Sequence, residues 1–276
     1  MGGPLSDAHG SHGGSAQIDS QMTLKQSTFE EIIESEQTLT LTADQRYGTY
    51  SRHASDCTIF LSRCIISVDP NRMMFARFYS LTKKQLLLAL LSTLRLHKVQ
   101  ALMNLRQVLE AGAAAAFAIA NPEPEHFAKT DANGFIDASQ DLTEKRYKWL
   151  AKHFPAGSEA IKKKKNLIND FAAHANVVAT NKTFEVNEVD NEISAPFFDA
   201  EDEYYVKTDL WQTASISIEL MGLLYEVNKT QNVVQFISNF EHHLRRVYDD
   251  NSALLMEMKR TERYKRAMER MQRASK

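Results

Sequence analysis

The chain has 276 residues, of which 43% are hydrophobic and 25% are charged, and its net charge at pH 7 is −2. This composition supplies enough apolar side chains for a sizeable core and excludes a wholly disordered chain. The small net charge excludes a global attraction to nucleic acid or to an anionic membrane, so any such partner must be recognised by a local cluster of charge.

The distribution of residue types divides the chain into three parts. Residues 1–22 are expected to be a disordered leader or a tag, because five of the chain's ten glycines lie between Gly2 and Ser15. Residues 23–258 are expected to form a single helical domain, since no flexible linker separates two cores. Residues 259–276 hold eight lysines or arginines against two glutamates, which predicts a basic extension of the C-terminal helix.

Helical periodicity dominates the first half of the domain. Apolar residues recur at three and four positions from about Asp44 to Ser67, which predicts a first strong helix that Asp69-Pro70 ends. A longer apolar stretch, from Thr82 to Ala120, predicts one continuous central helix around which the others pack. Thr82 and Gln85 form the capping box that is expected to open it.

The two cysteines, Cys57 and Cys64, lie seven residues apart on the first predicted helix, so their Cα atoms are expected roughly 10 Å apart. A disulfide requires a separation below about 7 Å. The spacing also places both thiols on one face, which predicts core cysteines and favours a reducing, cytoplasmic setting. The apolar run 86–91 is too short for a membrane span, which needs about 20 apolar residues, so no membrane association is expected.

Three charged residues stand on the predicted central helix. Arg95 and Arg106 are eleven positions apart, about three turns, and are therefore expected to share a face, with Glu110 one turn beyond Arg106. Charged side chains are rarely buried without a partner. This line of charge is either an ion pair that fixes the register of the helices or part of a binding site.

The second half of the domain mixes helices with one extended region. Helices are expected at Leu142–His153, at Ser158–His174, at about Lys207–Asn228 and from about Gln231 onward. Alternating residues near 182–198 predict a small β-hairpin. The predicted fold class is therefore mainly α, a helical bundle around one long central helix with a small β-hairpin.

Four consecutive lysines at 162–165 occupy the helix Ser158–His174. Because four neighbours spread around a helix, part of the run must be solvated. Lys162 and Lys165 belong either to a solvated face or to a phosphate-binding patch.

The common catalytic motifs are missing from the sequence. It has no Gly-rich phosphate loop, no Gly-x-Ser-x-Gly, no His-Glu-x-x-His and no Cys-x-x-Cys, and we predict neither a metal site nor a cofactor. His174 remains as a candidate, at the end of a helix with an apolar face. A histidine in such a place is either a core or capping residue or a catalyst.

Four segments, in this order, resemble a known group of proteins: Leu105-Arg106-Gln107-Val108-Leu109-Glu110, Lys148-Trp149-Leu150, Ile168-Asn169-Asp170-Phe171-Ala172-Ala173-His174-Ala175-Asn176 and Ala195-Pro196-Phe197-Phe198-Asp199. The group consists of uncharacterised bacterial helical proteins (AbiV-like) and is distantly similar to the HEPN-like superfamily. That superfamily includes RNases of toxin and phage-defence systems and inactive versions that bind RNA or nucleotides. The resemblance covers roughly residues 81–228.

One departure separates this chain from the RNases of that superfamily. They resemble one another in an arginine that precedes a histidine by four to six intervening residues. Counting back from His174, those positions hold Asn169, Ile168 and Leu167. The arginine is missing, unless Arg106 replaces it from a neighbouring helix.

The leading hypothesis is a non-enzymatic binding or interaction module, related to bacterial defence or stress, with a polar pocket near Arg106, Glu110 and His174. The residues expected to bind its ligand are Arg95, Arg106, Glu110, Asp170, His174, Lys162 and Lys165. The alternative is a metal-independent RNase in which His174 is the general base and Arg106 or Arg95 stabilises the transition state. A third hypothesis treats the charges as purely structural. RNA or a nucleotide is the expected partner, and a homo-oligomer is left open.

Overall fold

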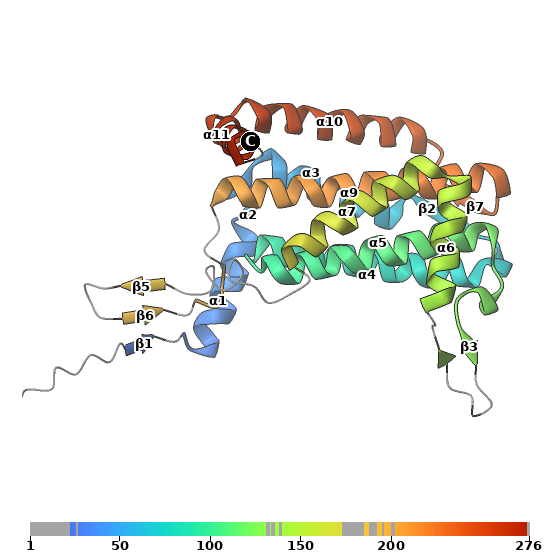
Figure 1. Cartoon of the computed structure of the whole chain (residues 1–276), viewed down its shortest axis with the longest axis horizontal. Coiled ribbons are helices and arrows are strands. Elements are labelled where there is room, and N and C mark those ends of the chain that lie inside the picture. The colour runs from blue at the N-terminus through green and yellow to red at the C-terminus, as the bar shows by residue number, and fades with distance from the viewer. Residues whose placement is uncertain are drawn as a thin grey trace, which may run out of the picture.

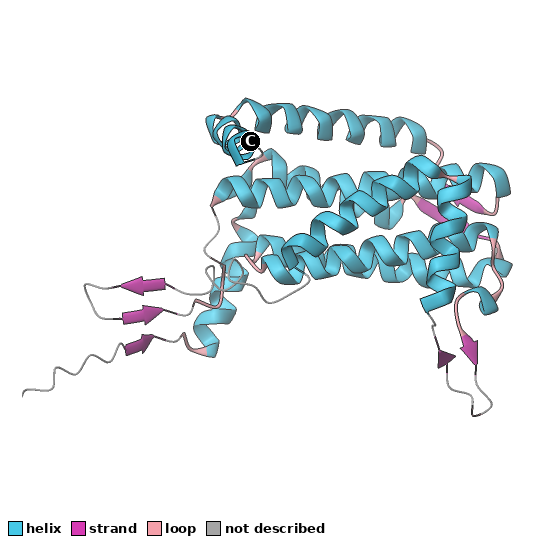
Figure 2. Cartoon of the chain, viewed as in Figure 1, coloured by secondary structure: helices cyan, strands magenta, loops and turns pink. Residues whose placement is uncertain are grey.

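The computed structural model describes residues 23–25, 27–130, 133, 136–137, 140–172, 185–187, 192–194, 196–199 and 202–274. The predicted leader, residues 1–22, lies outside these ranges. Within them the fold is mainly α, with a helical bundle and a small β-hairpin beside it (Figures 1 and 2). The predicted fold class is confirmed.

The bundle and its appendages consist of the following helices: α1 (Phe29–Leu41), α2 (Ala43–Tyr47), α3 (Thr49–Arg63), α4 (Met73–Leu94), α5 (Lys98–Ala120), α6 (Gln140–His153), α7 (Pro155–Ala172), α9 (Glu203–Gln231), α10 (Phe240–Arg260) and α11 (Glu262–Ala274). The strands are short: β1 (Thr23–Lys25), β2 (Ile65–Val68), β3 (Lys129–Thr130), β4 (Ile136–Asp137), β5 (Glu185–Asn187), β6 (Glu192–Ser194) and β7 (Val234–Phe236). Among the described residues, none of the helices combines the length and the apolar character needed to cross a membrane.

The strands pair in three small sheets. β5 and β6 are antiparallel, as predicted for residues near 182–198, and β1 adds to β6 in parallel. β2 pairs with β7 in antiparallel fashion, and β3 pairs with β4. The strand β2 corrects the prediction of a helix from about Asp44 to Ser67, because its β-branched residues find a partner strand 166 or more positions later in the chain.

The prediction of one helix from Thr82 to Ala120 is wrong. α4 begins earlier, at Met73, and α5 runs back beside it after a reversal at residues 95–97, where Leu96 has a φ of +60°. Thr82 therefore lies inside α4, where its hydroxyl donates to the carbonyl of Phe78. The expectation that Arg95 and Arg106 share a helix face fails for the same reason.

A segment distant in sequence holds this reversal in place. The N–H of Lys98 donates to Oδ2 of Asp199 at 2.6 Å, and the N–H of Asp199 donates to the carbonyl of Leu96 at 2.8 Å. The carboxylate thus caps the first turn of α5, where unpaired backbone N–H groups favour a negative charge. The ring of His97 also contacts those of Phe197 and Phe198.

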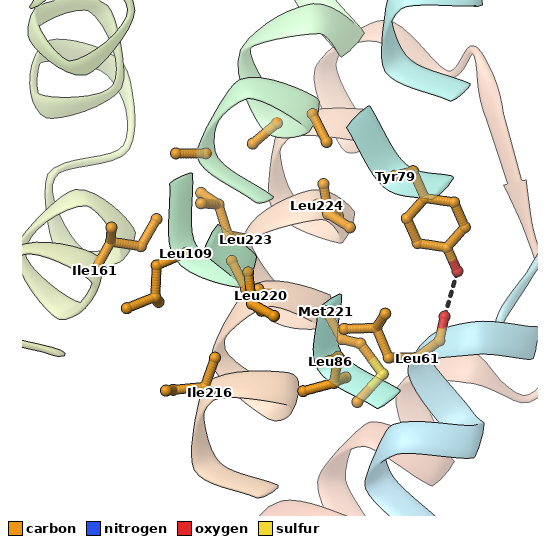
Figure 3. Packing of buried hydrophobic residues seen from close by; sticks show 14 of the residues in the cluster. Leu61, Tyr79, Leu86, Leu109, Ile161, Ile216, Leu220, Met221, Leu223 and Leu224 are labelled. Atoms are coloured by element: carbon orange, nitrogen blue, oxygen red, sulfur yellow. Dashed lines mark hydrogen bonds between the residues drawn. The ribbon is translucent and has the colours of Figure 1, made fainter. Parts of the chain in front are cut away.

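The long central element of the bundle is α9. It packs against α3, α4, α5, α7 and α10, and apolar residues are buried around most of its circumference. Figure 3 shows its side chains Ile216, Leu220 and Leu224 among those of the neighbouring helices. In the same core the hydroxyl of Tyr79 donates to the carbonyl of Leu61.

The small residues of α5 allow α5 and α9 to approach closely. A Cβ atom added at Gly112 would lie 2.6 and 2.8 Å from the two δ carbons of Leu220, which is fully buried. Gly222 of α9 has open space at the same position.

These two glycines give a matched test of the α5–α9 contact. Both Gly112→Ala and Gly222→Ala improve helix propensity by about 1 kcal/mol. Only Gly112→Ala crowds a packed core, at a cost of about 1–3 kcal/mol. We expect Gly222→Ala to raise and Gly112→Ala to lower the free energy of unfolding measured in urea. Equal stabilisation by both would contradict the close contact.

Both cysteines are free and buried, which confirms their prediction as core thiols. Burial raises the pKa of the Cys57 thiol to about 12 and that of Cys64 to about 11, from an ordinary value of 9.0. The neutral thiols are therefore favoured in the folded state.

The raised pKa values predict a loss of stability in alkali. Above about pH 9 the unfolded chain releases thiol protons that the folded chain retains, so the free energy of unfolding falls by at most about 1.4 kcal/mol per pH unit for each thiol. Urea unfolding at about pH 8 and about pH 10 measures this slope. The variant Cys57→Ala with Cys64→Ala should show a shallower slope, and an unchanged slope would show that other groups cause the loss.

Candidate functional site

Glu110 of α5 lies at the centre of a charged cluster. Nε of Arg106, one turn earlier, lies 3.3 Å from its Oε1, and Nζ of Lys165 on α7 lies 3.1 Å from the same oxygen. The predicted pair of Arg106 and Glu110 is therefore present, but the Arg106 side chain remains 43% exposed. Two cations thus share one carboxylate at the edge of the bundle.

Lys165 is the more enclosed of the two cations, with 22% of its side chain exposed. Its ammonium donates to the hydroxyl of Tyr147 on α6 at 3.2 Å and lies 4.7 Å from the centre of that ring. Burial lowers the pKa of Lys165, but Tyr147 and Glu110 together raise it further, so the net direction is upward. Lys165 therefore keeps its charge at neutral pH.

A cavity of about 510 Å³, which we call the amide hollow, opens beside this cluster. Its lining residues are Gln85, Gln100, Met103, Asn104, Arg106, Gln107, Glu110, Ile168 and Asn169. They come from α4, α5 and α7. Five of these nine side chains are amides, each of which can donate and accept hydrogen bonds.

The amides of the hollow leave hydrogen-bonding capacity for a ligand. Among the described residues, none donates a hydrogen bond to the buried Oδ1 of Asn169. In the same part of the chain, Nδ2 of Asn104 donates a long hydrogen bond, of 3.5 Å, to Oγ of Ser92. Buried polar atoms are normally satisfied, so an unsatisfied acceptor at the wall of a cavity indicates a place where a donor can bind.

A smaller cavity of about 230 Å³ adjoins the amide hollow through Gln107 and Glu110, which line both. Arg146 and Tyr147 of α6 form part of its wall. Arg146 donates to the carbonyl of His126 at 3.2 Å and to Oγ1 of Thr143 at 2.9 Å. Burial lowers the pKa of Arg146 below its ordinary value.

Arg95 lies apart from this site. Its guanidinium contacts Glu36 of α1 at 3.9 Å and Oγ1 of Thr40 at 3.5 Å, so it belongs to the reversal between α4 and α5. This position corrects its prediction as a binding residue beside Arg106, because the helix that was expected to align the two arginines is broken at Leu96.

The lysine run divides between solvent and interior. Lys162 is exposed, as a solvated face requires, whereas Lys164 donates to Oγ of Ser215 at 3.0 Å and lies 3.6 Å from Oε1 of Glu219, both on α9. Lys165 joins the Glu110 cluster instead. Of the two alternatives for the run, the solvated face fits Lys162, and Lys165 is the lysine that lies near the amide hollow.

Two further candidate binding residues, Asp170 and His174, lie partly or wholly outside the described residues. Asp170 lies in the last turn of α7, directly after Asn169, but its side chain is outside the described residues. His174 is outside them altogether. Among the described residues, no group of three His, Cys, Asp or Glu side chains could hold a metal ion.

The amides of the hollow were not predicted from the sequence, although α5 carries a signal for them. Gln100, Asn104 and Gln107 follow at spacings of four and three and continue to Glu110, which makes a polar stripe on one helix face. The contributions of Gln85 and Asn169 have no such signal, because they depend on how α4 and α7 pack against α5.

Comparisons with protein-family models, with curated proteins and with solved structures give no match to this chain.

The exposure of the Arg106–Glu110 pair predicts a small structural role. Exposed ion pairs contribute about 0–1 kcal/mol. We expect Arg106→Leu with Glu110→Leu to retain the fold and to change the free energy of urea unfolding by less than about 1 kcal/mol. Leu109→Ala is the control, because it removes a fully buried side chain of the same helix and should cost about 2–5 kcal/mol. A comparable loss in the double variant would make the pair a structural requirement.

Proposed function

We propose that the protein is a non-enzymatic module that binds a nucleotide, either free or as part of an RNA chain, in the amide hollow. One observation carries the proposal, namely the convergence of five amides and Arg106 on a single cavity of about 510 Å³. This volume lies within the usual range of ligand pockets, about 300–1,000 Å³.

The charge around the hollow favours an anionic group. Arg106 and Lys165 are balanced by Glu110 alone among the described side chains of the cluster, which leaves one excess positive charge. Arg146 adds another in the adjoining cavity. A guanidinium that reaches the edge of a pocket is suited to phosphate oxygens, since it presents several N–H donors in one plane.

The amides supply what a nucleobase requires. An Asn or Gln side chain can donate and accept at once, and it pairs with two atoms on the edge of a base, most often adenine. Unpaired bases of RNA offer those edges to a protein pocket. The resemblance to HEPN-like proteins, some of which bind RNA or nucleotides without cleaving them, supports the same ligand class and a role in bacterial defence or stress.

The alternative function is a metal-independent RNase. His174 follows α7, whose residues Ile168 and Asn169 line the hollow. In this mechanism His174 would take the proton of a ribose 2′-OH as its oxygen attacks the adjacent phosphorus, and Arg106 would stabilise the charge of the phosphorane. The bond from phosphorus to the 5′ oxygen would then break, which leaves a 2′,3′-cyclic phosphate and a 5′-hydroxyl that has taken up a proton.

Opposite substitutions in one ion pair test the binding function. Calorimetric titration with AMP should give weaker binding, by about tenfold, in Arg106→Gln, because a charged hydrogen bond to phosphate contributes about 1.5–3 kcal/mol. Glu110→Gln should bind AMP more tightly, since it removes the competing carboxylate. Lys148→Gln, an exposed cation on α6, should be unchanged. The absence of AMP and RNA binding by the wild type, or equal effects in both pair variants, would refute the assignment.

Incubation with total RNA in the presence of EDTA separates binding from cleavage. A binding module should retain the RNA intact. Cleavage that disappears in His174→Ala would overturn the non-enzymatic assignment and establish the RNase.

A further inference from the structure

Helix α1 presents an outward face that no described part of the chain covers. It has no buried residue, and Phe29, Ile33 and Leu41 expose 70%, 49% and 74% of their surface. These three residues fall on a stripe at spacings of four, with Gln37 completing it. All four charged residues of α1 are glutamates. Two of them, Glu30 and Glu34, are exposed beside this stripe and do not belong to the capping box at the start of the helix.

Helix α11 has the opposite charge and the same length of 13 residues. It carries five basic and two acidic residues, which gives +3 against −4 for α1. In the sequence, its arginines stand at positions 263, 266, 270 and 273, a spacing that predicts one stripe along a helix. Among the described side chains of α11, Tyr264 and Met268 lie one turn apart and form a second, apolar stripe.

One charged residue anchors each of the two helices to the rest of the chain. Glu36 of α1 accepts from His97 at 3.2 Å and lies 3.9 Å from Arg95. Arg263 of α11 lies 2.8 Å from Asp202 and over the ring of Tyr205. These contacts fix the two helices while they leave Glu30, Glu34 and Arg266 exposed.

We infer that α1 of one copy docks against α11 of a second copy of this chain, and the reverse, in a two-fold dimer. In Figure 1 the two helices lie at the same end of the bundle, α11 above it and α1 below it. A two-fold axis at that end places each α1 beside the α11 of the other copy, and such an axis closes the assembly. The acidic and basic faces then meet, and the two apolar stripes are removed from water.

Nucleic acid fits these two faces less well than a second copy does. Phosphates would pair with the arginine stripe of α11 but would leave Tyr264 and Met268 uncovered. They would be repelled by Glu30 and Glu34, and the exposed Phe29 of α1 would gain nothing. A partner that matches both the acidic and the apolar residues of α1 must be basic and amphipathic, and α11 of a second copy has both properties.

Light scattering coupled to size exclusion tests the dimer. Because exposed charges drive the contact, we expect a dimer at about 0.1 M salt that dissociates toward monomer at about 1 M, where the Debye length falls to about 3 Å. Glu30→Lys with Glu34→Lys, and separately Arg266→Glu with Arg270→Glu, should each be monomeric. The chain that combines all four reversals should dimerise again, which a folding defect could not produce.

Every other outcome counts against the dimer. A monomeric wild type at both salt concentrations, or a dimer that survives either set of reversals, overturns it. If the wild type is monomeric and Arg266→Glu with Arg270→Glu alone loses binding to a labelled RNA, α11 is an RNA-binding surface instead. AMP binding in the amide hollow is independent of these substitutions, so its failure and that of the dimer are distinguishable. Matched circular dichroism spectra establish that the variants fold.

Discussion

The reversal at Leu96 is the constraint on which the rest of the structure depends. A leucine with a φ of +60° is uncommon, because its Cβ crowds the backbone in the left-handed region. The surrounding contacts offset that cost, since Asp199 bonds to the carbonyl of Leu96 itself and to the N–H of Lys98, two residues later. The reversal turns one apolar stretch into two antiparallel helices, and it brings Gln85 of α4 to the same cavity as Gln100 and Asn104 of α5.

The reversal could not be predicted from local sequence, for a physical reason. The residues Leu94-Arg95-Leu96-His97-Lys98 contain no glycine or proline, and their helix propensities are ordinary. The carboxylate that caps the start of α5 after the reversal comes from Asp199, 101 positions away. The hairpin of β5 and β6 was predictable because its strands are close in sequence, whereas β2 was missed because its partner β7 is distant. Local patterns thus predicted local structure, and long-range capping and pairing decided the rest.

In the candidate site, too, some features follow from local sequence and others depend on long-range packing. The Arg106–Glu110 pair and the two core thiols follow from spacing along single helices, and the structure contains both. The third member of the charged cluster, Lys165, required the packing of α7 against α5. Because Lys165 adds a second cation, the balanced ion pair becomes a cluster with one excess positive charge. An ion pair that only fixes the register of the helices does not require an excess positive charge, whereas a phosphate-binding site does.

The segment from Arg95 to Lys98 connects the hollow to the outer surface. Arg95 and His97 hold Glu36 of α1, and the next residue, Lys98, begins the helix that supplies most of the hollow. Gln100, the first amide of the polar stripe, lies two residues after Lys98. A single capped turn therefore positions both the acidic helix α1 and Gln100 in the wall of the amide hollow. This arrangement explains why the charge of Glu36 can be structural while Glu30 and Glu34 of the same helix stay exposed. The difference is that the Glu36 carboxylate contacts Arg95 and His97 of its own chain. The path of residues 95–98 in three dimensions determines which glutamate of α1 makes these contacts.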